Sequence, residues 1–227
     1  MKIGILMAGH APDQIKHKTG DYDEMFRRIL GSYDFEFVVY DVENMDFPAS
    51  ARDADGWLIS GSKHGAYDPL PWIPKLEELI QDIYALKCPL VGICFGHQII
   101  AQALGGHVEK FAGGWATGTT TYDFGGKSVK LNAWHQDQVT TLPPGAVVLG
   151  GNDFCKNAIL GYGDHVFTVQ PHPEFDGDVI AGLLEFRAIG NVPDAQIERT
   201  KTTLAETDWT VIASEMARVF QQKKGAA

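Results

Sequence analysis

The sequence predicts an α/β protein with a mostly parallel central sheet, helices on both faces of that sheet and an antiparallel extension. In residues 1–106, short and continuously apolar runs alternate with segments of helical periodicity, which is typical of parallel strands buried on both faces. From residue 108 to residue 170 the pattern changes to short strands separated by glycine-rich turns, which indicates an antiparallel extension of the same sheet. Helical patterns return after Glu174.

Predicted strands and helices alternate through the first half. The strands are residues 2–9, 35–42, 56–62 and 88–94, and the helices are residues 21–31, 71–87 and 95–106. Acidic residues at the start of the first helix suit an N-terminus, and Gly31 suits its end. Pro74 falls in the first turn of the second helix, where proline is tolerated.

The second half supplies the predicted antiparallel strands and the last helices. The strands are residues 117–124, 127–134 and 165–170, and the helices are residues 176–190, 194–206 and 208–222. Asp176 is suited to cap the first of these helices, and we expect the charged tail 221–227 to fray. Because no repeat, low-complexity segment or linker interrupts the pattern, we predict one domain over residues 1–227, with a C-terminal helical appendage from about residue 191.

Charge and cysteine content restrict the partners and the compartment. The net charge of -10 argues against nucleic acid or an anionic membrane as a partner, since both would repel this surface. No apolar run approaches the roughly 18 residues of a membrane span. Cys88, Cys94 and Cys155 are widely spaced and form no CxxC pair, which fits a reducing compartment. We therefore predict a cytoplasmic protein.

The segment Gly-Ile-Cys-Phe-Gly, residues 92–96, joins a predicted strand to a predicted helix. Glycines two positions on either side of Cys94 would let a sharp turn raise the thiol above the sheet, as in a nucleophile elbow. The N-terminus of the following helix would then stabilise the thiolate. The alternative is that Cys94 is a small buried hydrophobic residue, as most free cysteines are. The pentapeptide alone does not decide between these interpretations.

The segment Pro-His-Pro-Glu, residues 171–174, offers a base for this thiol. A residue before proline favours an extended backbone, and side chains at i and i+2 of an extended segment share a face. Glu174 can therefore accept a hydrogen bond from one nitrogen of His172 and leave the other nitrogen to face Cys94. The alternative is a surface loop with an unrelated histidine, which the flanking prolines disfavour.

These two segments resemble the marks of the class I glutamine amidotransferases, a G-x-C-x-G-x-Q turn and a later H-P-E, here "GICFGHQ" and "PHPE". The resemblance covers about residues 2–190 and implies a flavodoxin-like class I glutaminase fold. It also implies that Cys94 is the nucleophile, His172 the general base and acid, and Glu174 its orienting partner. Within the family, the chain looks most like the stand-alone GMP-synthase-like proteins and the γ-glutamyl peptidases.

Two turns are predicted to stabilise the oxyanion of an acyl-transfer reaction. One donor is the backbone N–H of Phe95, directly after the candidate nucleophile. The second, by resemblance, comes from "ISGSKHGAYD", where relatives have S-G-G-P, so that Gly61 and Ser62 are the candidates. The alternative is that this is an ordinary Gly-Ser turn.

The resemblance also points to residues that contact the substrate. Gln98 corresponds to the family's substrate-contacting glutamine, and its amide can both donate and accept. "NAWHQDQV" replaces the usual S-H-G-D, so that Trp134, His135 and Gln136 match the stretch that holds the α-amino and α-carboxylate groups. Trp134 stands for Ser and Gln136 for Gly, which we take as a sign that the substrate extends beyond an amide NH₂. Trp134 could equally be a core residue.

No cofactor is expected from the sequence. His97, His107 and His135 lack the spacing of a metal-binding motif. The glycine-rich segments lack the fingerprint of a dinucleotide loop, and no Walker motif is present. We therefore predict neither a metal site nor ATP chemistry.

Three functions are compatible with these features. The first is an enzyme that hydrolyses or transfers a γ-glutamyl group through a cysteine thioester, acting alone on γ-glutamyl amides, γ-glutamyl peptides or glutamine. The second is a glutaminase subunit that supplies ammonia to a separate synthetase partner. The third is a non-catalytic metabolite-binding protein, which the intact Cys-His-Glu set disfavours. The altered substrate segment and the lack of a synthetase domain favour the first.

Overall fold

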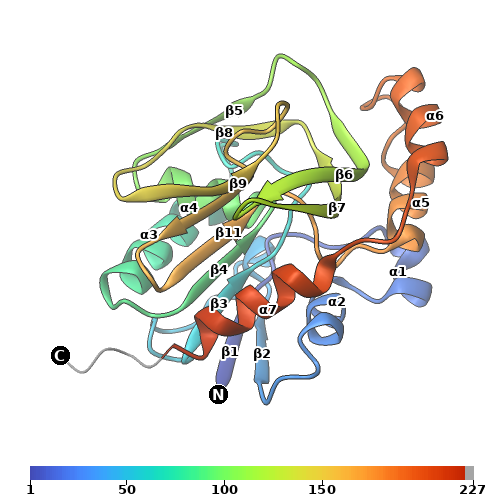
Figure 1. The fold of residues 1–227 in the computed structure, drawn as a ribbon. Coiled ribbons are helices and arrows are strands. Elements are labelled where there is room, and N and C mark those ends of the chain that lie inside the picture. Colours follow the sequence, from blue (N-terminus) through green and yellow to red (C-terminus); the bar gives the residue numbers. More distant parts are fainter. Residues whose placement is uncertain (223–227) are drawn as a thin grey trace.

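The computed structural model describes residues 1–222 as an α/β fold built around a nine-stranded sheet (Figure 1). Most of the tail predicted to fray, residues 223–227, lies outside the described residues. Within the described part of the chain, no helix is both long enough and apolar enough to cross a bilayer. The predicted α/β class is confirmed.

Parallel strands form one half of the sheet, in the order β2-β1-β3-β4-β11. These strands are β1 (Lys2–Leu6), β2 (Glu36–Tyr40), β3 (Gly56–Ile59), β4 (Leu90–Ile93) and β11 (Val166–Val169). The residues of β3, β4 and β11 are all buried, whereas β2 at the edge of the sheet is partly exposed. Strands buried on both faces need continuous apolar sequence, which is what the first half of the chain provides.

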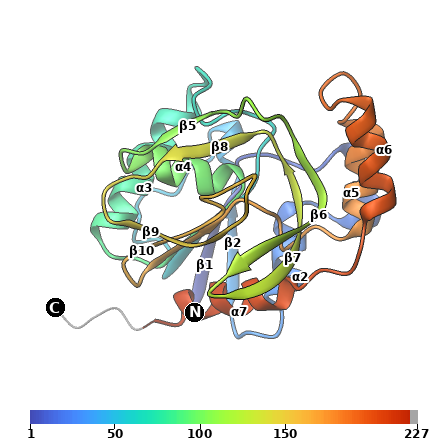
Figure 2. The same cartoon turned by 45° about the horizontal axis from the view of Figure 1, so that its top comes forward.

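Antiparallel strands continue the sheet from β11 in the order β10-β9-β6-β7. They are β10 (Ile159–Tyr162), β9 (Ala146–Gly151), β6 (Ala116–Phe124) and β7 (Lys127–His135). The predicted antiparallel extension is therefore present. β6 and β7 form a long hairpin that curves away from the parallel strands, as the turned view shows (Figure 2).

The prediction for residues 165–170 needs a correction. β11 belongs to the parallel half, because it pairs in parallel with β4 and only its other edge pairs antiparallel with β10. Its four buried residues match the apolar character of a central strand, but the sequence does not reveal its neighbours. The extension also includes β9 and β10, which were not predicted. β5 (His107–Lys110) and β8 (Asp137–Thr141), likewise not predicted, form a separate two-stranded sheet.

Helices cover both faces of the sheet (Figure 1). On one face lie α3 (Trp72–Ala85) and α4 (Phe95–Ala103), which pack against each other. The other face is covered by α1 (Asp13–Thr19), α2 (Tyr22–Ile29), α5 (Gly177–Phe186) and α7 (Trp209–Phe220). α6 (Asp194–Thr203) packs against β6, and a short 3-10 helix, η1, spans Val42–Asn44. The last two helices thus contact the sheet.

Capping explains several of the helix boundaries. Asp21 and Glu24 form a capping box at the start of α2, and the Asp176 side chain accepts the N–H of Val179 at the start of α5, as predicted. Gly31 follows the C-cap of α2 but does not have the positive φ of a left-handed cap. α4 ends at Ala103, three residues before the predicted end. α1 was not predicted.

Candidate active site

Three neighbouring strands end at one place on the sheet, and each is followed by a segment of the candidate site. The turn after β3 contains Gly61 and Ser62, β4 leads into Cys94, and β11 leads towards His172. The strands are in register there, because Ile93 pairs with Val169 and the N–H of Cys94 donates to the carbonyl oxygen of Val169 at 2.9 Å. The carboxyl ends of parallel strands are the usual place for a site in an open α/β sheet.

Cys94 occupies a strained turn between β4 and α4. Its φ of 52° and ψ of -102° put a residue with a side chain in a region that is normally left to glycine. A methyl group on Gly92 would lie 2.5 Å from the carbonyl oxygen of Gly96. A methyl group on Gly96 would collide with the carbonyl oxygen of Ile59 in β3. The two glycines therefore allow the tight crossing that raises the thiol.

This crossing predicts that Gly96→Ala destabilises the fold by about 2 kcal/mol or more, because the added methyl group meets backbone rather than a flexible side chain. Helix propensity alone would stabilise the alanine variant by up to ~1 kcal/mol, so a net loss of stability would have to come from the steric collision. Gly177→Ala is the matched control, since Gly177 begins α5 and open space surrounds its added methyl group. Urea unfolding of both variants measures the difference. Equal midpoints would contradict the steric explanation of the turn.

His172 and Glu174 form a buried pair behind the thiol. Nδ1 of His172 lies 2.7 Å from Oε1 of Glu174, and the two side chains are 3% and 1% exposed. The backbone N–H of His172 donates to the carbonyl oxygen of Asn132 at 2.8 Å, which fixes the extended segment against β7. The imidazole stacks on the ring of Phe175, with centroids 3.8 Å apart and planes 6° from parallel. The ring is therefore held by Glu174 and Phe175, and the backbone of His172 by Asn132.

The charge environment favours the imidazolium form of His172. Burial acts against the charged ring, but the carboxylate of Glu174 and the thiolate and hydrogen bond of Cys94 outweigh it and raise the pKa of His172 to about 10. The three candidate triad residues thus interact with one another. In such a set the cysteine sulfur can attack a carbonyl carbon, and the imidazolium that the carboxylate orients can then protonate a leaving group.

The turn after β3 lies close to the candidate catalytic pair. Ser60 fixes it, because its Oγ accepts the N–H of Ala8 at 2.9 Å and donates to the carbonyl oxygen of Gly61 at 3.0 Å. A methyl group on Gly61 would lie 3.0 Å from Cε1 of His172 and 3.8 Å from Cβ of Cys94, so this position faces the candidate catalytic pair. The N–H groups of Gly61 and Ser62 find no backbone acceptor within residues 1–222.

The N–H of Phe95 is the other predicted donor. Phe95 is the first residue of α4, whose first N–H groups have no carbonyl partner within the helix. Its ring is buried against Trp72, with centroids 5.4 Å apart, and this contact fixes the start of the helix. The N–H groups of Phe95 and Ser62 therefore remain the candidate donors to a developing oxyanion.

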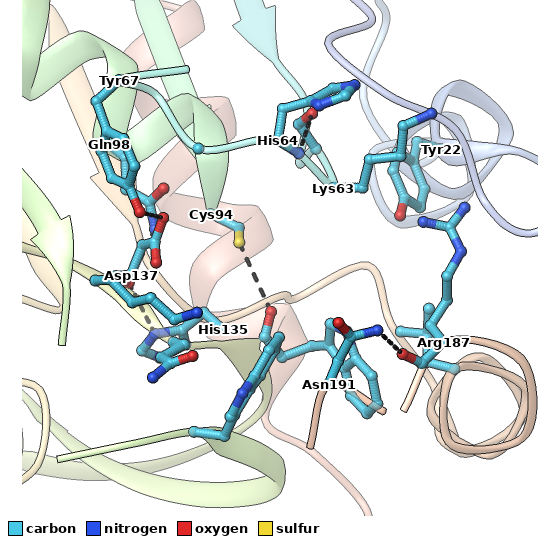
Figure 3. Close-up of a pocket in the computed structure, with 17 residues that line it drawn as sticks. Tyr22, Lys63, His64, Tyr67, Cys94, Gln98, His135, Asp137, Arg187 and Asn191 are labelled. Carbon is cyan, nitrogen blue, oxygen red and sulfur yellow. Dashed lines mark hydrogen bonds between the residues drawn. The ribbon is translucent and has the colours of Figure 1, made fainter. Parts of the chain in front are cut away.

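A cavity of about 330 Å³ opens at Cys94 and is lined by the predicted substrate residues (Figure 3). Nε2 of Gln98 donates to the carbonyl oxygen of Asp137 at 3.0 Å and to Oε1 of Gln170 at 3.1 Å. Its amide hydrogens therefore hold the segment that follows β7. The carbonyl oxygen is the part of Gln98 that these bonds do not use.

The segment from Trp134 to Gln136 forms one wall of this cavity. The carbonyl oxygen of Trp134 lies 3.9 Å from Sγ of Cys94, and the indole stands beside Trp115 with centroids 6.1 Å apart. His135 is buried with Nδ1 3.2 Å from the carbonyl oxygen of Asp137, and burial lowers its pKa to about 4. Nε2 of Gln136 donates to the carbonyl oxygen of Phe111 at 3.4 Å. The structure thus brings all three residues to the cavity, with His135 neutral.

The cavity has further lining residues that sequence reasoning missed. Tyr67 donates from its hydroxyl to Oδ2 of Asp137 at 2.9 Å, and burial raises the pKa of Asp137. Tyr22 and Arg187 reach the cavity from the other side (Figure 3). Asp137 could have been noticed, since it follows Gln136 directly. Tyr67 lies in the quoted segment ISGSKHGAYD, five residues after Ser62, whereas Tyr22 and Arg187 come from distant segments and give no signal in the sequence.

The described part of the chain contains no grouping of three or more His, Cys, Asp or Glu side chains suited to hold a metal ion. His97 and His135 are buried, and His107 is exposed on β5. Nδ1 of His97 lies 2.8 Å from Oγ1 of Thr168, a contact inside the fold.

Comparison with known proteins gives consistent results. The family model described as glutamine amidotransferase class-I matches residues 19–184. The chain is 28% identical over 201 residues to gamma-glutamyl peptidase 3 of Arabidopsis thaliana, with 81% of each protein covered. It is 28% identical over 167 residues to a glutamine-hydrolyzing GMP synthase subunit of Halobacterium salinarum, with 68% of this chain and 84% of the relative covered. A solved glutamine amido transferase from Methylobacillus flagellatus has the same fold, with a TM-score of 0.75, 22% identity, and 97% of this chain and 92% of that one covered.

Proposed function

Because the chain belongs to the class I glutamine amidotransferase family, we propose that it hydrolyses or transfers γ-glutamyl groups through a thioester on Cys94. The observation that supports this most is the buried His172–Glu174 pair interacting with a thiol that stands at the floor of an open cavity. Relatives named as a gamma-glutamyl peptidase and as a GMP synthase subunit support the general γ-glutamyl hydrolase or glutaminase class.

The reaction follows from the geometry of these groups. The Cys94 thiolate attacks the γ-carbonyl carbon, a C–S bond forms, and the oxyanion accepts hydrogen bonds from the N–H groups of Phe95 and Ser62. His172 protonates the leaving nitrogen as the C–N bond breaks, which releases an amine, a peptide or ammonia. His172 then takes a proton from water, whose oxygen attacks the thioester and releases glutamate, or from an acceptor amine in transfer. Glu174 holds the ring and stabilises its charge.

We propose that the enzyme acts alone, and the fixed oxyanion turn supports this. Ser60 anchors the turn through two buried hydrogen bonds to its own chain, so no partner is needed to bring the donors into place. Trp134 and Gln136 line the cavity, and the resemblance to the family's S-H-G-D stretch implies smaller residues at these two positions, which supports a substrate larger than glutamine. The similarity to a gamma-glutamyl peptidase is consistent with this preference.

The alternative is a glutaminase subunit that supplies ammonia to a synthetase partner. The similarity to a GMP synthase subunit favours it. In that case free glutamine would be the substrate, and turnover would depend on the partner.

We expect the purified protein, without ATP or a partner, to cleave γ-glutamyl peptides or amines faster than free glutamine. One preorganised oxyanion donor is worth roughly 10²–10³ in rate, so a fixed turn predicts ready turnover by the free chain. The assay follows glutamate release from γ-glutamyl peptide, γ-glutamyl amine and glutamine at matched concentrations. Activity on glutamine alone, and only after a cell extract with ATP is added, would reverse the ranking of the two functions.

A further inference from the structure

The cavity at Cys94 has two sides of different chemistry (Figure 3). On one side Asp137 and Tyr67 join through their hydrogen bond beside Gln98. On the other side Arg187 extends from the end of α5 towards Tyr22 and Lys63. Within residues 1–222, Asp137 is the one acidic side chain in the cavity lining, although Lys110 lies near enough to act on its charge, and Arg187 is the cation farther along the other side. The two sides can therefore bind groups of opposite charge.

The position of His172 identifies the leaving-group side. The leaving nitrogen must reach the imidazole that protonates it, so the leaving group departs on the side of the cavity behind which His172 lies. Phe175 stacks on the buried ring of His172 and contacts Tyr22, which lines the cavity, with the Phe175 and Tyr22 ring centroids 5.7 Å apart. The guanidinium of Arg187 stands next to Tyr22 in the cavity, and its positive charge acts on the Tyr22 hydroxyl (Figure 3). Arg187 is therefore on the leaving-group side.

The charge of Arg187 is available to a ligand. No Asp or Glu in residues 1–222 forms an ion pair with it, and its guanidinium makes a long hydrogen bond of 3.5 Å from Nη2 to the carbonyl oxygen of His10. Lys63 differs, because its Nζ already pairs with Oε1 of Glu43 at 3.0 Å. Arg187 is half-buried, and Asn191 donates to its carbonyl oxygen at 3.0 Å, which fixes its backbone. A partly buried guanidinium that extends from a fixed backbone is suited to bidentate pairing with a carboxylate.

We propose that Arg187 binds a carboxylate of the leaving group, so that the preferred substrates are γ-glutamyl amino acids and peptides rather than γ-glutamyl amines. This deepens the proposed γ-glutamyl hydrolysis and rests on it for the direction of the substrate. Arg187 acts as a specificity residue and takes no part in the transfer of protons. The γ-glutamyl half, with its ammonium group, lies on the side of Asp137.

The test measures binding in the Cys94→Ala protein, which cannot turn the ligands over. Calorimetry compares γ-glutamylglycine with γ-glutamylglycinamide, which has the same shape but no carboxylate. A charge-assisted pair predicts about 10- to 100-fold tighter binding of the glycine compound. Adding Arg187→Met should bring this ratio close to one, and Arg187→Lys should retain part of it. Arg28→Met is the matched control, since Arg28 also donates from a helix to a carbonyl oxygen, that of Thr19, but lies outside the cavity.

Several outcomes would overturn the assignment. These are a ratio near one in the parent protein, a ratio unchanged by Arg187→Met, no measurable binding of γ-glutamylglycine, or an equal loss for both compounds. The last would mean that the guanidinium binds the shared γ-glutamyl half or only stabilises the end of α5. Unfolding midpoints of the Met and Lys variants separate a folding defect from lost recognition. If γ-glutamylglycine binds with the expected preference but the unaltered enzyme does not cleave it, the proposed hydrolysis fails while the role of Arg187 stands.

Discussion

The Cys94→Ala protein is expected to lose γ-glutamyl hydrolysis down to the background rate, a fall of roughly 10⁴-fold or more. The thioester cannot form without the sulfur. The strained φ of 52° serves to present this one side chain, and alanine keeps the Cβ that the turn already accommodates. The variant should therefore fold normally while it loses turnover.

Selective labelling tests the same point on the unaltered protein. A glutamine-like diazo-ketone should modify Cys94 first, because the thiol faces the cavity beside His172. Cys155 is the internal comparison, since it is buried and burial raises its pKa to about 12. Mass spectrometry of the digested protein locates the label, and Cys155→Ala serves as the activity control. Equal labelling of both cysteines, or activity that survives Cys94→Ala, would exclude the thioester mechanism.

The parts of the site that are local in sequence could be predicted from it. The turn at Cys94 is specified by its two glycines within five residues. The pairing of His172 with Glu174 is specified by their spacing of two residues. The candidate oxyanion turn rests on resemblance, and the structure shows that only its glycine is closely packed: a methyl group at Gly61 would lie 3.0 Å from Cε1 of His172, whereas the Ser62 hydroxyl accepts the N–H of His64. Where the backbone approaches another segment this closely, the sequence shows it as a glycine.

Features that depend on which segments meet in space could not be predicted. β11 lies next to β4 although more than sixty residues separate them along the chain, and no local pattern specifies this pairing. Arg187 and Tyr22 reach the cavity from helices whose sequences show only amphipathic patterns. β5 was missed because only one of its four residues is buried, which leaves no hydrophobic periodicity to detect.

The Glu174→Gln protein is expected to retain measurable turnover, reduced by roughly 10²–10⁴ at neutral pH, whereas His172→Ala should fall to the background like Cys94→Ala. Glutamine keeps the shape of the side chain and can still accept a hydrogen bond from Nδ1, so the ring stays oriented. What it removes is the negative charge that helps to hold the imidazolium. The difference between the two variants separates the residue that moves protons from the one that positions it.

The pH dependence gives a readout that a folding defect would not imitate. The pKa of His172 is raised to about 10, which means that the imidazolium persists through neutral pH and is lost as the pH rises towards that value. The alkaline limb of kcat/KM should therefore lie at high pH in the unaltered enzyme. Glu174→Gln removes one of the charges that raise this pKa, so the limb should move to lower pH.

Glu185→Gln, on the exposed face of α5, is the charge-matched control and should leave the limb in place. If the alkaline limb does not move in Glu174→Gln, then Glu174 does not stabilise the imidazolium. If this variant is as inactive as Cys94→Ala, then Glu174 does more than orient the ring and stabilise its charge.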